Sequence, residues 1–203
     1  MFKLFKRKPN KSGQLQFFFT RLASNPLLEP AVFIVMLAIF VACSAYFALH
    51  LHKAIVPDEP GHFYLSTLFA GTWRTPEPTD YSFALGHSQF NREPFMYYWI
   101  NGRFLNLLTL VIPGVSEWRQ LLFLRLVSVL YSTGTVIFTY LLALEILRKR
   151  WWPLLVAFLT TSTLMFVFLS GGVSYDNPAN LCAAAGTYFL VKVLQGKKIV
   201  THS

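Results

Sequence analysis

The hydrophobic residues of this 203-residue chain fall into long runs that contain few or no charges. Four such runs cover residues 31–51, 120–147, 152–172 and 179–195. About 20 consecutive apolar residues, wound as a helix, match the hydrocarbon thickness of a bilayer. Helices are expected because backbone polar groups in lipid must be satisfied within the segment. The pattern therefore predicts an all-α, polytopic membrane protein with about four transmembrane helices.

The segment between the first two runs, residues 52–119, is long and rich in polar residues. It holds two shorter apolar stretches, at 61–73 and 97–115. Pro60 suits the first turn of a helix over the first stretch. The second stretch contains Arg103, and an arginine in mid-membrane costs at least ~2.5 kcal/mol. We therefore expect one large outer loop with two helices that lie along the membrane interface.

The charged residues are separated along the chain by sign. Basic clusters precede the first run and follow the second and fourth, whereas most acids follow the first and third. Cytoplasmic loops of membrane proteins carry the excess of lysine and arginine. This predicts a multi-pass protein of the bacterial inner membrane with both termini in the cytoplasm. Residues 1–30 are expected to form a basic cytoplasmic tail with an interfacial segment, and residues 31–203 the membrane domain.

Composition narrows the class of protein further. Only 13% of the residues are charged, against roughly 25% in soluble domains. Membrane orientation accounts for the net charge of +9, and no groove-reading or stacking motif accompanies it, so nucleic acid is not expected as a partner. Cys43 and Cys182 both lie inside apolar runs, which argues against a disulfide framework.

Candidate chemistry begins at an acidic pair. Asp58 and Glu59 come directly after the first run and Asp176 directly after the third, so the predicted topology places all three on the outer face. Carboxylates at a membrane boundary are costly unless they meet water, a metal ion or a cation. A carboxylate can take a proton from an attacking hydroxyl, and an arginine can hold a phosphate with its planar fork. Such groups together suit a reaction on a lipid-linked phosphate.

Simpler structural roles are open to the same residues. Asp58 could cap the following helix, with Glu59 favouring the dipole of that helix. Asp176 lies in an Asp-Asn-Pro sequence, which is common in turns. His62, four residues after Asp58, could share a helix face with it and bind metal, or could simply be hydrogen-bonded. Arg125 could pair with a carboxylate or reach the lipid headgroups instead of binding substrate.

Four features, in order along the chain, resemble the C-type glycosyltransferase superfamily. They are Asp58-Glu59 with His62-Phe63 after it, the segment 93–99 (EPFMYYW), the segment 124–129 (LRLVSV) and Asp176. Members are multi-spanning enzymes that use polyprenyl-phosphate sugars, such as protein O-mannosyltransferases and lipid A aminoarabinose transferases. The chain is also similar to a bacterial family of predicted membrane proteins of this kind. Such enzymes have more spans than are expected here, so the chain fits a fragment, a half-enzyme with a partner membrane subunit, or a non-catalytic relic.

The resemblance implies roles for the acidic residues. Asp58 would be the catalytic carboxylate, acting as a base on the acceptor or through a metal ion, and Glu59 would assist it. Asp176 would support catalysis or bind metal. The candidate ligands of a divalent cation, Mg²⁺ or Mn²⁺, are therefore Asp58, His62 and Asp176.

The resemblance also implies a donor site. Arg92, Tyr97 and Arg125 are the candidate residues for binding a lipid-linked sugar donor, and Arg92 adjoins the segment beside which the transferases carry a phosphate-binding basic residue. The expected function is transfer of a sugar from a polyprenyl-phosphate donor to an acceptor at the outer face, by a glycosyltransferase or its N-terminal module surrounded by membrane lipids. The alternative is a non-catalytic membrane scaffold or assembly subunit that retains the same helices.

Overall fold

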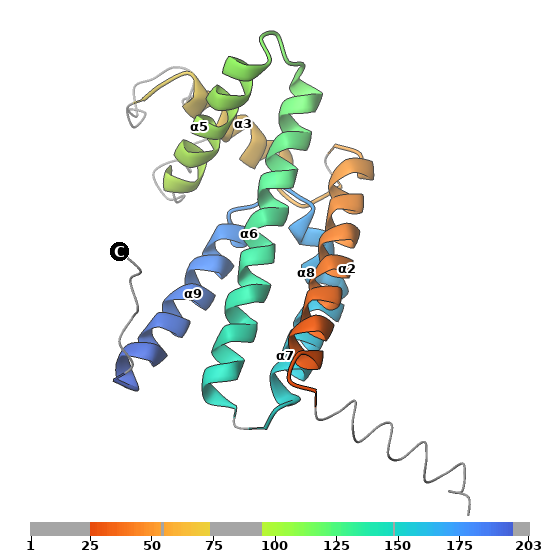
Figure 1. Cartoon of the computed structure of the whole chain (residues 1–203). Helices are drawn as coiled ribbons and strands as arrows, with labels where there is room; N and C mark the ends of the chain where they lie inside the picture. The colour runs from red at the N-terminus through yellow and green to blue at the C-terminus, as the bar shows by residue number, and fades with distance from the viewer. Residues whose placement is uncertain (1–24, 54, 74–94, 148, 197–203) are drawn as a thin grey trace, which may run out of the picture.

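The computed structural model describes residues 25–53, 55–73, 95–147 and 149–196, and these residues contain helices and no strands (Figure 1). The all-α prediction is therefore confirmed for this part of the chain. In chain order the helices are α2 (Leu28–His50), α3 (Glu59–Ala70), α5 (Phe95–Val111), α6 (Glu117–Ile146), α7 (Trp152–Ser162), α8 (Leu164–Ser170) and α9 (Asp176–Leu194).

The longest of these helices, α6, lies at the centre of the molecule. It packs against α9 on one side and against α2 and α7 on the other, as Figure 1 shows. Glu29 at the start of α2 accepts a hydrogen bond of 3.3 Å from Tyr140, and Lys192 near the end of α9 pairs with Glu145 at 2.7 Å. The start of α2 and the end of α9 therefore both lie at the C-terminal end of α6. We call this the basic end, because it also carries Arg150.

The opposite end of the bundle is the acidic end. Here the C-terminus of α2, the N-terminus of α3, the turn after α8 and the start of α9 meet the N-terminal half of α6 (Figure 1). Asp58, Glu59 and Asp176 all belong to these segments. The chain thus runs alternately between the two ends through α2, α6, α7–α8 and α9.

Two of the described helices, α2 and α6, are long and apolar enough to cross a membrane. The pair α7 and α8 adds a third span if the two helices form one bent crossing. Many large apolar side chains on these helices are exposed at the protein surface, as expected for helices surrounded by lipid. The four-span prediction is therefore supported only as two or three spans, and a crossing by α9 stays a prediction.

The predicted run 152–172 is broken, with α7 and α8 meeting at an angle of 65°. The break falls at Thr163, whose hydroxyl donates to the Leu159 carbonyl at 2.8 Å. Thr160 and Thr161 also donate to carbonyls four residues earlier, at 2.9 Å each. Hydroxyls that bond back in this way compete with the backbone ladder and bend helices. Apolar content alone does not reveal this local competition.

Helices α3 and α5 pack closely against each other beside the N-terminal half of α6. A Cβ atom added at Gly102 of α5 would lie 2.7 Å from the Phe69 carbonyl carbon and 2.8 Å from the Ala70 nitrogen of α3. Glycine therefore permits the backbones to touch. Arg103 then donates to the Thr72 carbonyl at 2.8 Å and to the Phe69 carbonyl, which satisfies the C-terminus of α3. Both helices fall within residues 52–119, and their placement along a membrane interface stays a prediction.

Two apolar cores hold these elements together. The core at the acidic end joins α3, α5 and α6 through Phe63, Leu65, Phe69, Tyr97, Tyr98, Leu105, Leu121, Leu124 and Val173. The second core, towards the basic end, joins α2, α6, α7 and α8 through Phe33, Phe40, Val136, Tyr140, Leu154, Ala157 and Val167. Arg125 falls between the two cores along α6, and this is where the candidate site is built.

Candidate functional site

The Arg125 side chain is fully buried and uses all of its hydrogen-bonding capacity on the protein. Its Nη1 donates to the carbonyls of Ala48 and Leu51 at 3.1 and 2.7 Å, and its Nη2 to that of His52 at 3.2 Å. Nε and Nη2 donate to the two oxygens of the Glu59 carboxylate, at 2.8 and 2.5 Å, in a bidentate pair. An arginine has five N–H donors, so these five bonds satisfy the guanidinium completely.

The Glu59 carboxylate is likewise buried and hydrogen-bonded within the protein. It is 1% exposed, and besides Arg125 it accepts a hydrogen bond of 3.1 Å from the Val173 backbone nitrogen. The pair therefore joins the end of α2, the start of α3, the N-terminal half of α6 and the turn that leads into α9. We call Glu59, Arg125 and these partners the clasp.

The clasp satisfies the last carbonyls of α2 and neutralises two buried charges. The last carbonyls of a helix lack partners within the helix, and the C-terminal end of α2 is where a cation is most favourable. Two buried charges are tolerated because each neutralises the other and every remaining polar atom is bonded. Of the roles that the sequence left open for Arg125, pairing with a carboxylate is the one present in the structure. Glu59 likewise lies in the first turn of α3.

Asp58 immediately precedes the clasp and has an unusual backbone conformation. With φ 58° and ψ 0°, it is the only non-glycine residue with positive φ among the described residues. Asparagine and aspartate are the side chains that best tolerate this left-handed region. Asp58 occupies the N-cap position of α3, yet its side chain makes no capping hydrogen bond there. The carboxylate is exposed, so the expected structural use of Asp58 is not the one found.

The turn 171–176 lies directly against this segment. Val173 bonds to Glu59, and the ring of Tyr175 stands edge-on to that of His62 with centroids 5.1 Å apart. Asp176 begins α9, is exposed, and accepts a hydrogen bond of 3.3 Å from the Ser174 hydroxyl. The structure thus brings Glu59, His62 and the residues next to Asp176 into one region at the acidic end.

The predicted metal ligands do not form a group of three. Among the described residues, no cluster of three or more His, Cys, Asp or Glu side chains is close enough to hold a metal ion. His62 is buried, and its Nδ1 lies 2.9 Å from the hydroxyl of Tyr98. Asp58 and Asp176 are exposed carboxylates. The residues present do not amount to a preformed cation site, and we derive no chemistry from one.

The predicted donor-binding residues Arg92 and Tyr97 differ in what the structure shows of them. Arg92 lies outside the described residues. Tyr97 is 6% exposed, and its hydroxyl has no hydrogen-bond partner in the described part of the chain. Burial raises the pKa of Tyr97 above its usual range, so the hydroxyl is neutral. The Oδ1 atom of Asn101, one turn along α5, is also buried and unpartnered. The Asn101 and Ser128 side chains lie near the Tyr97 hydroxyl, and their polar groups partly oppose the effect of burial on its pKa. This hydroxyl therefore has polar neighbours inside the protein.

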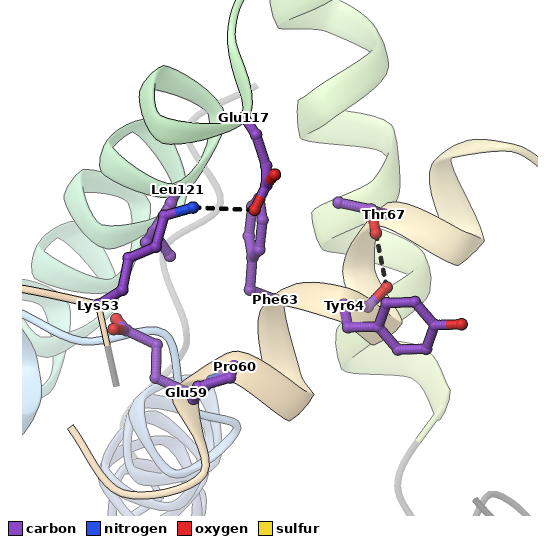
Figure 2. A pocket seen from close by; sticks show the side chains of 8 residues that line it. All are labelled: Lys53, Glu59, Pro60, Phe63, Tyr64, Thr67, Glu117 and Leu121. Atoms are coloured by element: carbon purple, nitrogen blue, oxygen red, sulfur yellow. Dashed lines mark hydrogen bonds and ion pairs between the residues drawn. The ribbon is translucent and has the colours of Figure 1, made fainter. Parts of the chain in front are cut away.

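A cavity of about 440 Å³ adjoins the clasp on the side of α3 and α6 (Figure 2). Its lining consists of Lys53, Glu59, Pro60, Phe63, Tyr64, Thr67, Glu117 and Leu121. Figure 2 shows Lys53 and Glu117 meeting near the Phe63 ring, with 2.9 Å between Nζ and Oε1. Sequence analysis did not single out Lys53 or Glu117. Nothing in the local sequence joins two residues that are 64 positions apart.

Comparison with known proteins adds no relative. No protein-family model, no curated protein and no solved structure matches this chain. The resemblance to C-type glycosyltransferases therefore depends on the motifs quoted above, and the function must be argued from the geometry of the acidic end.

Proposed function

We propose that this chain is a membrane glycosyltransferase, or the N-terminal module of one. It transfers a sugar from a polyprenyl-phosphate donor to an acceptor at the outer face of the bacterial inner membrane. Support comes from the apolar helices, from the order of the four motifs and from the exposed carboxylate of Asp58 at the acidic end. The proposal extends to the cytoplasmic position of both chain ends.

Asp58 is the proposed general base. Its carboxylate takes the proton of an acceptor hydroxyl while the hydroxyl oxygen attacks the anomeric carbon. The bond from that carbon to the phosphate oxygen breaks, and the polyprenyl phosphate leaves with the bonding electrons. One direct displacement of this kind inverts the anomeric centre. Arg92 is the proposed phosphate contact, and Tyr97 is the proposed second contact to the donor. A divalent cation at Asp58, His62 and Asp176 stays a prediction, and no step of this mechanism depends on it.

The observation that carries the proposal is the left-handed backbone at Asp58. Sparsely populated backbone conformations cost of order 1–3 kcal/mol and cluster at functional sites. Here the clasp fixes the next residue, Glu59, through Arg125 and Val173. This anchoring over-determines the backbone at Asp58 and leaves its carboxylate exposed. In this account Glu59 and Arg125 are positioning residues that act through Asp58.

The Asp58→Asn variant tests the proposal. Asparagine keeps the left-handed preference and the size of the side chain but removes the base. Transfer of labelled sugar from polyprenyl-phosphate glucose and polyprenyl-phosphate mannose should fall at least a hundredfold, as expected for loss of a general base. The matched control is Glu29→Gln at the basic end, which should keep turnover. Retained turnover in a folded Asp58→Asn protein would rule out the assigned base.

A second candidate is a non-catalytic scaffold or assembly subunit. It is favoured by one observation: the buried charges of Glu59 and Arg125 are paired with each other and serve the packing of the helices. A scaffold would co-purify with a stoichiometric membrane partner. Its function would be unchanged in Asp58→Asn, which separates it from the enzyme.

A further inference from the structure

The cavity beside the clasp has a distinctive distribution of charge. Phe63, Pro60 and Leu121 form apolar walls, and the Thr67 hydroxyl donates to the Tyr64 carbonyl at 2.7 Å. Glu59 also lines the cavity, but both of its oxygens are bonded to Arg125. Of the eight lining residues, the charged groups left for a ligand are therefore Lys53 and Glu117.

These two charges are easily separated. The Lys53 and Glu117 side chains are 49% and 69% exposed, and exposed ion pairs contribute only about 0–1 kcal/mol. A ligand can therefore replace either partner at little cost. Glu117 repels an anionic ligand that binds Lys53. Lys53 likewise repels a cationic ligand that binds Glu117. A ligand that carries both charges replaces the Lys53–Glu117 ion pair with two ion pairs, one to each side chain.

We propose that this cavity binds a zwitterion, with an ammonium group on Glu117 and a phosphate or carboxylate on Lys53. The volume of about 440 Å³ falls within the range of roughly 300–1,000 Å³ that is typical of small-molecule sites. The walls formed by Phe63 and Leu121 accept the carbon skeleton, and the ring of Phe63 adds cation–π attraction for the ammonium. This inference does not depend on the proposed glycosyl transfer.

The position of the cavity indicates two sources for such a ligand. Lys53 lies three residues beyond the end of α2, a helix apolar enough to cross the membrane. Glu117 is the first residue of α6, the other helix of that kind. The ligand is thus either the headgroup of a zwitterionic lipid, such as phosphatidylethanolamine, or a soluble compound of the same chemistry.

Calorimetric titration of the purified full chain with glycerophosphoethanolamine tests the shared chemistry. Glycerol 3-phosphate, which is only anionic, and ethanolamine, which is only cationic, are the probes for comparison. The zwitterion should bind at least tenfold more tightly than either. Lys53→Glu and Glu117→Lys should each weaken its binding at least tenfold, and the double reversal Lys53→Glu/Glu117→Lys should restore it to within about threefold.

Native mass spectrometry from mixed phosphatidylethanolamine and phosphatidylglycerol nanodiscs distinguishes the sources. Preferential retention of phosphatidylethanolamine that depends on Lys53 and Glu117 identifies a lipid headgroup, and soluble binding without lipid preference identifies a free compound. Absence of binding in both arms overturns the proposal. Binding of glycerol 3-phosphate or ethanolamine to the native protein as tightly as the zwitterion also overturns it. So does failure of a folded double reversal to recover binding.

Discussion

At the scale of single residues, burial decides which polar groups are structural. Sequence patterns placed Asp58, Glu59 and Asp176 at one end of the bundle, and the structure agrees. They did not show that Glu59 would be buried and bonded to Arg125, since the two are 66 positions apart. Adjacent acids thus have opposite environments: Asp58 is exposed and Glu59 is 1% exposed. Only tertiary packing reveals this division.

Breaking the clasp from either side should be costly. Arg125→Met leaves the Glu59 carboxylate and the carbonyls of Ala48, Leu51 and His52 without the arginine, and should destabilise the fold by about 3–5 kcal/mol. Glu59→Gln keeps an oxygen for Val173 but leaves the buried guanidinium without a counter-charge, so it should also be strongly destabilising. Thermal unfolding in detergent measures both.

The matched control for the clasp is Lys53→Met, which breaks the exposed pair with Glu117 and should change stability by less than about 1 kcal/mol. Equal effects of Arg125→Met and Lys53→Met would contradict the structural role of the clasp.

Tyr97 separates a structural from a binding role. Its buried hydroxyl has no hydrogen-bond partner among the described residues, so Tyr97→Phe should leave the melting temperature unchanged or raise it. If the hydroxyl contacts the sugar donor, KM should rise about 5- to 10-fold, in line with the loss of one hydrogen bond. A marked loss of stability in Tyr97→Phe would show that the hydroxyl is already satisfied by the protein.

At the scale of helices, apolar runs predicted most elements to within a few residues. The runs 31–51 and 120–147 correspond to α2 (Leu28–His50) and α6 (Glu117–Ile146). The run 152–172 failed as a single helix because the backbone is extended at Thr163, where α7 and α8 meet at 65°. Hydropathy measures the cost of leaving water and does not report such a local break in the backbone.

The close contact between α3 and α5 predicts opposite stability effects for alanine at Gly102 and at Gly61. Gly102→Ala places a methyl group less than 3 Å from the backbone of Phe69 and Ala70, so the helices must separate, at a cost of about 1–3 kcal/mol. Gly61→Ala, in α3 with no neighbour within 4 Å, should instead stabilise the helix by about 0.5–1 kcal/mol. Unfolding curves of the two variants should shift in opposite directions, and equal shifts would refute close packing at Gly102.

At the scale of the whole molecule, the length of α6 relates the site to the membrane. Its 30 residues span about 45 Å at ~1.5 Å per residue, whereas the hydrocarbon core is ~30 Å thick. If α6 crosses the membrane, one end must extend beyond the hydrocarbon. The N-terminal end, which packs with α3 and α5 and lines the cavity, fits this position. The outer face would then carry both the Asp58 region and the proposed zwitterion site.

The alternation of helices between the two ends agrees with the charge pattern of the sequence. Arg150 lies at the basic end beside Glu29, and Asp58 and Asp176 lie at the acidic end. The positive-inside rule predicts from this that the acidic end lies outside. The alternation itself follows from charge bias and apolar length, which can be read along the chain. The site cannot be read in this way, because its contacts join residues more than 60 positions apart.

The most direct test of the account is whether Asp58 and Asp176 face the same aqueous compartment. Asp58→Cys and Asp176→Cys would be made in a background with Cys43→Ser and Cys182→Ala, and spheroplasts treated with a membrane-impermeant maleimide. Lys149→Cys at the basic end is the control. We predict that both cysteines at the acidic end react in intact spheroplasts, and that Lys149→Cys reacts only after the membrane is disrupted. Reaction of the two acidic-end positions from opposite sides would contradict the account.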